Sequence, residues 1–112
     1  KLAARPLSRA RAEAFDIAPN ILIDNRASNR YTVIVANARD RPALLYDLAF
    51  ALFEERVTIH SAHIATYGER AVDTFYVTDL TNDKIESVTR LSALEARLLA
   101  AASDMRPAIR AA

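Results

Sequence analysis

The stretch that decides the fold is Asp40-Arg41-Pro42-Ala43-Leu44-Leu45-Tyr46-Asp47-Leu48. Residues 33–36 before it are β-branched or small, as is typical of a strand, and residues 37–40 interrupt that run with turn formers. Pro42 suits a first helical turn, where its missing N–H costs nothing, and Asp40 is placed to cap the helix. The sequence therefore predicts a strand that passes directly into a helix.

The predicted helix carries two apolar surfaces. The first has helical spacing and predicts a contact with the core; it contains Leu44, Leu45, Leu48, Ala49 and Leu52. The second lies on a different side of the helix and contains Tyr46, Phe50 and Phe53. In a lone subunit this second patch would be exposed to water, so we expect it to meet another domain or subunit. The alternative is a set of scattered surface aromatics.

The composition is that of a single soluble globular domain. The 112 residues are 52% hydrophobic and 26% charged, with a net charge of +1. Because acids and bases are interleaved, no basic field favours nucleic acid or an anionic membrane, and we expect neither as a partner. The lack of cysteine rules out disulfides and thiolate metal sites and is compatible with the cytoplasm, where we expect the protein. No apolar run approaches the ~20 residues of a spanning helix.

Four strands are expected, in two hairpins. They are residues 21–24, 31–37, 57–67 and 71–79. Gly68, the sole glycine, turns the second hairpin and predicts a positive φ there. The apolar residues of the third strand change parity midway, which predicts a β-bulge near His60 and Ser61.

A second helix is expected after the polar residues 81–83, and Pro107 stops it. Its start stays open: Ser92 and Glu95 have the spacing of a capping box, whereas Ile85 and Val88 already fit the apolar stripe. The stripe contains Val88, Leu91, Leu94, Leu98, Leu99 and Ala102.

This order of elements predicts an α+β fold of the ferredoxin-like kind, a four-stranded antiparallel sheet with two helices on one face. The ferredoxin-like fold usually ends in a strand after the second helix, and this chain has too few residues there to form that strand. Residues 21–24 can fill the same edge from the other end of the chain, which gives a permuted order, ββαββα. Both parities of strand 31–37 are apolar, so we expect the second face of the sheet to be covered by another copy or domain.

Two strings of residues carry a resemblance to a known family. The strand, the loop at residues 40–42 and the helix after it resemble the ACT domain, a small regulatory module with a ferredoxin-like fold. The longer string at residues 58–79 resembles the C-terminal ACT repeat of bifunctional uridylyltransferase/uridylyl-removing enzymes, which modify the nitrogen-signalling protein PII. We expect an ACT domain at residues 19–104 and a tail at 105–112. Residues 1–18 are expected to form a linker within a longer protein, because their first part is rich in Arg and Ala with little amphipathic pattern.

The resemblance implies a non-catalytic regulatory domain that senses glutamine and pairs with another ACT module, as a repeat or a homodimer. The parent's transferase and hydrolase activities, with magnesium or another divalent metal, would lie in other domains, and no cofactor is expected here. The implied ligand site combines a loop with a facing strand: Asn37, Asp40, Arg41, Pro42, Ala43 and Leu44, with Ile59, His60 and Ser61 opposite. Whether glutamine binds this repeat or a neighbouring one stays open.

Other functions fit the residues less well. His60 and His63 would lie on opposite faces of a regular strand, although a bulge could bring them together. They have no clear third ligand, so we expect no metal site. An RNA-binding module of the same shape would use Tyr31, Phe75 and Tyr76, but the near-neutral charge disfavours it. An acylphosphatase-like enzyme would need an anion-cradling loop with a recognisable motif, which is missing. A purely structural or dimerising ACT module stays an alternative.

Overall fold

The computed structural model describes residues 18–103. The elements in chain order are β1 (Asn20–Asp24), β2 (Thr32–Arg39), α2 (Leu44–Glu54), β3 (Thr58–Tyr67), β4 (Arg70–Thr78) and α3 (Val88–Ala102). The predicted tail, and all of the predicted linker except Ala18, lie outside the described residues.

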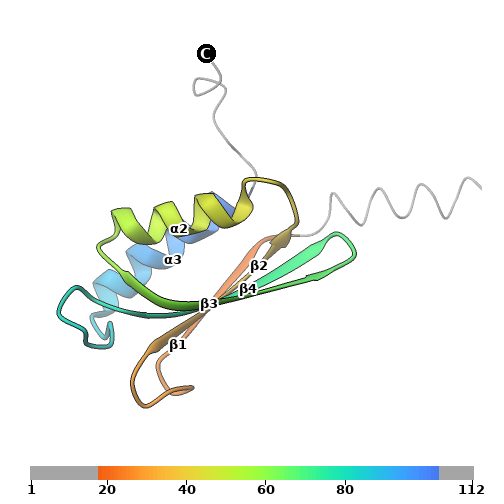
Figure 1. Ribbon diagram of the computed structural model, residues 1–112. Coiled ribbons are helices and arrows are strands. Elements are labelled where there is room, and N and C mark those ends of the chain that lie inside the picture. Colours follow the sequence, from red (N-terminus) through yellow and green to blue (C-terminus); the bar gives the residue numbers. More distant parts are fainter. Residues whose placement is uncertain (1–17, 104–112) are drawn as a thin grey trace, which may run out of the picture.

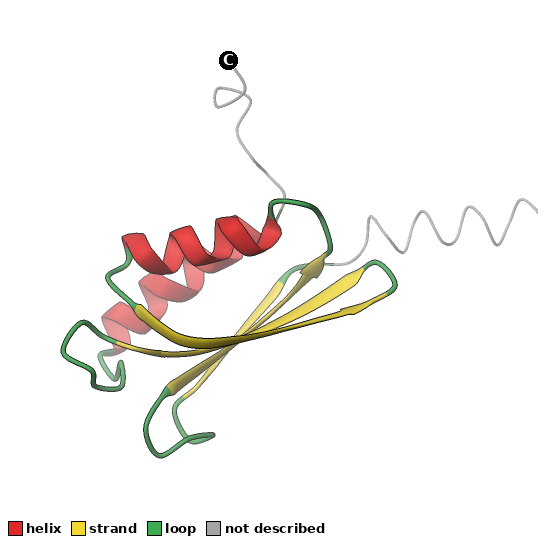
Figure 2. Ribbon diagram, in the orientation of Figure 1, coloured by secondary structure: helices red, strands yellow, loops and turns green. Residues whose placement is uncertain are grey.

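The four strands form one antiparallel sheet in the order β1-β2-β4-β3. Both helices lie on the same face of this sheet (Figure 1), with α3 over β1 and β2 and α2 towards β3. β1 occupies the edge beside β2, where Leu22 is opposite Val35. The permuted ferredoxin-like α+β fold is therefore confirmed, and Figure 2 shows its two layers, helices above and strands below.

The core fills the space between the sheet and the helices. Ile34 and Phe75 from the central strands are buried against Leu48 of α2 and Leu98 of α3. The apolar stripe predicted for α3 is too broad, because Val88 is 78% exposed at the first turn of the helix. Only the part of the stripe that faces the sheet is covered. Its buried members are Leu94, Leu98 and Ala102.

The helix starts differ from the predicted capping. Ala43 is the N-cap residue of α2, and no side chain caps this end. The cap predicted for Asp40 is wrong because a turn at residues 42–43 separates it from the helix; its backbone N–H instead donates to the carbonyl of Glu69, at 2.8 Å. At α3 the hydroxyl of Ser87 accepts from the N–H of Arg90, so the helix begins at Val88 and not at Ser92.

Two local predictions about the second hairpin are confirmed. The pairing of β3 with β4 shifts register between Ile59 and Ser61, which is the expected bulge. Gly68 has a φ of 62° in the turn that joins the two strands. The bulge adds His60 to the strand and changes which side chains of β3 face the helices.

Two apolar surfaces of the described chain remain exposed. Tyr46 and Phe53 of α2 are 66% and 72% exposed, and both stack on Phe50. The sheet face away from the helices carries no covering element among residues 18–103 (Figure 1), and Leu22 is exposed there. The exposure of the aromatic patch is as predicted, while the partner that covers either surface stays a prediction. Within the described part, neither helix has the length and apolarity to cross a membrane.

Candidate functional site

A cavity of about 460 Å³ lies beside the loop that joins β2 to α2. This loop and the first turn of α2 form one wall, and β3 and β4 form the other. The lining residues are Asp40, Arg41, Pro42, Leu44, Leu45, Ile64 and Asp73. Because charged groups stand beside aliphatic ones, the cavity suits a small molecule with one charged end and an apolar stem.

Asp73 is the most unusual residue of this cavity. Its side chain lies on the core face of β4, in line with Ala71 and Phe75, and the residue is only 1% exposed. Its cross-strand neighbours are Ala36 and Ile64, whose side chains offer no hydrogen-bond donor. Accordingly its Oδ1 has no hydrogen-bond partner among the described residues. Burial raises the pKa of Asp73, and the nearby carboxylate of Asp40 raises it further.

Arg41 fixes the loop to both helices. Its Nη1 donates to Oδ2 of Asp47 at 2.9 Å, and its Nη2 donates to the carbonyl of Ala101 at 2.6 Å. The side chains of Arg41 and Asp47 are each 14% exposed. Its guanidinium is therefore engaged in holding the loop against α2 and the last turn of α3.

Of the remaining predicted site residues, Ala43 lies in the same loop, as the N-cap residue of α2, and the others lie elsewhere. The loop of Asp40 adjoins the end of β3 where Tyr67 pairs with Arg70, whereas Ile59 to Ser61 lie near the other end, where Thr58 pairs with Thr78. Asn37 pairs with Val72 on the face away from the helices. A single chain does not bring these residues to the loop, so their place in one site stays a prediction.

His60 and His63 contact aromatic side chains on the open face of the sheet. His60 lies 5.0 Å from Tyr31 and His63 lies 5.5 Å from Tyr76, measured between ring centroids. Nε2 of His60 is 2.8 Å from the hydroxyl of Thr78. The described residues contain no group of three His, Cys, Asp or Glu side chains that could hold a metal ion.

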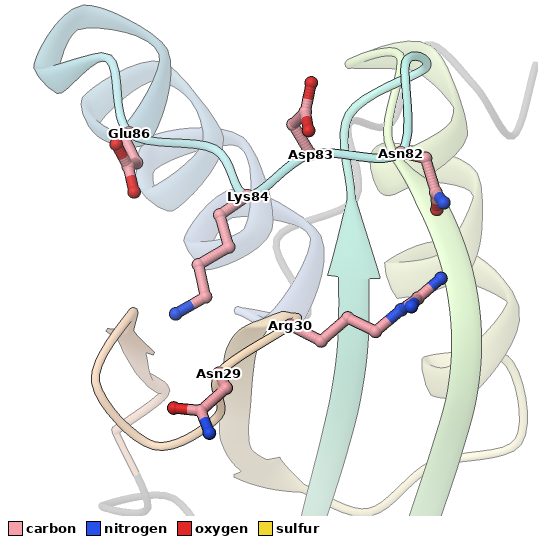
Figure 3. A pocket seen from close by; sticks show the side chains of 6 residues that line it. All are labelled: Asn29, Arg30, Asn82, Asp83, Lys84 and Glu86. Atoms are coloured by element: carbon pink, nitrogen blue, oxygen red, sulfur yellow. The ribbon is translucent and has the colours of Figure 1, made fainter.

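A second hollow, of about 610 Å³, lies between the β1–β2 loop and the loop that follows β4 (Figure 3). Its lining residues are Asn29, Arg30, Asn82, Asp83, Lys84 and Glu86. Lys84 points towards the β1–β2 loop, where its amine donates to the carbonyl of Asn25 at 2.8 Å. Both signs of charge are present, and none of the predicted site residues lies here.

Comparison with known proteins gives the relationship of the chain. It is 64% identical over 106 residues to the bifunctional uridylyltransferase/uridylyl-removing enzyme of Novosphingobium aromaticivorans, which covers 95% of this chain and 12% of that enzyme. The chain is homologous to one segment of the bifunctional uridylyltransferase/uridylyl-removing enzymes.

Other uridylyltransferase/uridylyl-removing enzymes show the same match. The identity is 62% over 107 residues for Zymomonas mobilis and 59% over 108 residues for Erythrobacter litoralis, and these matches cover 95% and 96% of this chain. The chain spans 12% of the length of each of these relatives. No family model matches it. Among solved structures, an unknown protein from Galdieria sulphuraria aligns with 59% of this chain and 37% of its own, at 22% identity and a TM-score of 0.46.

The sequence prediction of the site missed three residues that line the cavity, Leu45, Ile64 and Asp73. A signal for Asp73 was present, because it shares the parity of Phe75 and Val77, which face the core. A carboxylate in a core register indicates either a paired charge or a ligand site. No comparable signal marks Ile64, since its contact with the loop depends on the position of α2.

Proposed function

We propose that this chain is a regulatory ACT-type domain that senses an amino acid, glutamine, within a bifunctional uridylyltransferase/uridylyl-removing enzyme. The observation that carries the proposal is the cavity between the loop at Asp40 and the buried carboxylate of Asp73. The homology to these enzymes and the ferredoxin-like fold support it.

The chemistry of the cavity matches a free amino acid. An α-ammonium group needs acceptors, and the carboxylates of Asp40 and Asp73 supply them. The aliphatic side chains of Leu44, Leu45 and Ile64 suit the methylene groups of a side chain such as that of glutamine. The volume falls within the range of about 300–1,000 Å³ that is common for small-molecule sites.

In this proposal the chain regulates but does not catalyse. Addition of uridylyl groups to PII, and their removal, would take place in other domains of the parent enzyme, with a divalent metal there. Glutamine bound at the cavity would shift the parent between the two activities, because a ligand biases an equilibrium by its difference in affinity for the two states. The shift would pass through a second ACT module packed against this one.

Isothermal titration of L-glutamine tests the proposal. The ligand is added to this chain and to a longer protein that includes the preceding segment of the parent, with D-glutamine as the control. Heat from L-glutamine with both proteins is the expected result. Heat with the longer protein alone would assign this chain a supporting role, and heat with neither would overturn glutamine sensing.

A second candidate function, a purely associative module, is favoured by the exposed aromatic stack of Tyr46, Phe50 and Phe53. An apolar patch of this kind commonly marks a protein interface. Sedimentation of the chain and of the variant Phe53→Ser tests it. Association that the variant abolishes, in a chain that binds no amino acid, would favour this second function.

A further inference from the structure

We propose that Asp73 and Asp40 together form a receptor for one primary ammonium group, so that the cavity holds its ligand by the amino end. This inference rests on the proposed amino-acid sensing and names the part of the ligand that the cavity recognises. It assigns the central role to Asp73, a strand residue on the core face, and an assisting role to the loop residue Asp40.

The first support is the unpartnered oxygen of Asp73. An almost fully buried carboxylate normally has its oxygens hydrogen-bonded, because burial without partners is unfavourable. Here Oδ1 has no donor among the residues that the structure describes, and Asp73 lines the cavity. A donor from a ligand in the cavity would complete the hydrogen bonding of this carboxylate.

The second support is the charge of the cavity. Two carboxylates line it, Asp40 and Asp73, and one guanidinium, that of Arg41. Arg41 is engaged with Asp47, which is outside the lining, and with the carbonyl of Ala101. The two carboxylates therefore dominate the potential, which favours a cation and repels a ligand carboxylate. Burial is the main cause of the raised pKa of Asp73, and the carboxylate of Asp40 raises this pKa further.

The third support distinguishes an ammonium group from a metal ion. Calcium takes about six to eight oxygen ligands and magnesium about six. A site with two carboxylates and aliphatic neighbours offers fewer oxygen ligands than either ion needs. Within residues 18–103 no third His, Cys, Asp or Glu completes such a cluster. A primary ammonium has three N–H donors and needs only a few acceptors at one side.

The apolar part of the lining sets the direction of the ligand. Pro42, Leu44, Leu45 and Ile64 complete the cavity beside the two carboxylates. An aliphatic stem attached to the ammonium group would lie along these side chains, and a ligand carboxylate would point out of the cavity. A ligand that retains the amino group but lacks a carboxylate should therefore still bind.

Carbon-13 NMR of the carboxyl groups in Asp-labelled chain tests the inference directly. Three probes are titrated: L-glutamine, 4-aminobutanamide, which lacks the carboxylate, and glutaramic acid, which lacks the amino group. The signal of Asp73, assigned by its loss in Asp73→Asn, should move with the first two probes. Glutaramic acid should bind at least about ten-fold more weakly, as expected for loss of a charge-assisted pair.

The variants give a second readout. Asp73→Asn keeps the shape of the side chain and should weaken the binding of 4-aminobutanamide by at least about ten-fold. Asp40→Asn should weaken this binding less, because Asp40 is exposed. Glu86→Gln removes a carboxylate from the other hollow and is the matched control, which should change nothing.

The outcomes separate this inference from the proposed function. Binding of glutamine without movement of the Asp73 signal would overturn the ammonium receptor and leave glutamine sensing intact. Movement with 4-aminobutanamide but no binding of glutamine would support the receptor and overturn glutamine as effector. An equal response to glutaramic acid, or no response to any probe, would overturn the receptor.

Discussion

The hydroxyl of Thr32 accepts a hydrogen bond of 2.9 Å from the backbone N–H of Ile85, 53 positions along the chain. The same hydroxyl donates to Oδ1 of Asn25 at 2.6 Å, and Nδ2 of Asn25 donates to the carbonyl of Ile85 at 2.7 Å. Thr32 and Ile85 are both buried. This network joins the first hairpin to the segment that enters α3, and so positions a helix that touches the Asp40 loop through Arg41.

Thr32→Val should lower the free energy of unfolding by about 2 kcal/mol, because the buried N–H of Ile85 loses its acceptor while the side-chain volume is kept. Urea denaturation measures the loss. Thr89→Val, at an exposed position of α3, is the control and should change stability by less than about 0.5 kcal/mol. Equal effects of the two variants would contradict the role of the network.

Arg41→Met should destabilise the chain by about 2 kcal/mol, because it removes the guanidinium from the largely buried carboxylate of Asp47 and from the carbonyl of Ala101. Arg97→Met is the matched control, since Arg97 pairs with Glu54 and Glu55 at the surface. It should cost no more than about 1 kcal/mol. Chemical denaturation of both variants checks this order, and a larger loss for Arg97→Met would refute it.

Asp73→Asn should make the unliganded chain more stable at neutral pH. Burial and Asp40 raise the pKa of Asp73 in the folded state. The folded chain therefore keeps the proton of the Asp73 carboxyl to higher pH than the unfolded chain does, in which the pKa of Asp73 is near 3.8. The wild-type chain therefore loses stability as pH rises through the window between the two pKa values, and the variant lacks that loss.

The melting temperature as a function of pH measures this effect. The gain in Asp73→Asn should be present above the folded pKa and should vanish below about pH 3.8, where Asp73 is protonated in both states. Asp40→Asn should give a smaller gain, because it removes only the lesser cause of the raised pKa. A gain that persists unchanged in acid would show that the effect has another origin.

Gly68→Ala should cost about 1 kcal/mol. The φ of 62° is unfavourable for alanine, but a Cβ at this position would meet nothing within 4 Å, so the cost comes from the backbone alone. Gly68→Asn should cost less, since asparagine tolerates this region better. Thermal unfolding of the two variants checks the order, and the reverse order would be inconsistent with a purely conformational cost.

Ser87→Ala should lower the stability by about 1 kcal/mol, because the hydroxyl of Ser87 caps α3. Ser92→Ala should be neutral or slightly stabilising, since Ser92 lies inside the helix, where alanine is preferred. Hydrogen exchange of the first turn of α3 should quicken only in Ser87→Ala. Destabilisation by Ser92→Ala instead would place the N-cap of the helix five residues later, at Ser92.

The elements and the order of the sheet could be predicted from local patterns. Period-two apolar runs, the turn at Gly68 and the apolar stripes of the helices depend on neighbours within a few residues, and these defined four strands and two helices. Short hairpins and crossovers through helices then left few topologies, so residues 21–24 were correctly placed at the edge beside β2.

The extent of burial along each helix, and the cavity, depended on how these elements pack. Val88 and Leu45 fit the apolar stripes but remain exposed, because the sheet covers only part of each helix. Asp40 fits a cap, but the turn at residues 42–43 moves the helix start beyond its reach. Asp73 joins Asp40 in one cavity because the register of β4 and the position of α2 bring them there. Such long-range contacts are fixed by close packing of the whole domain, which no single stretch of sequence encodes.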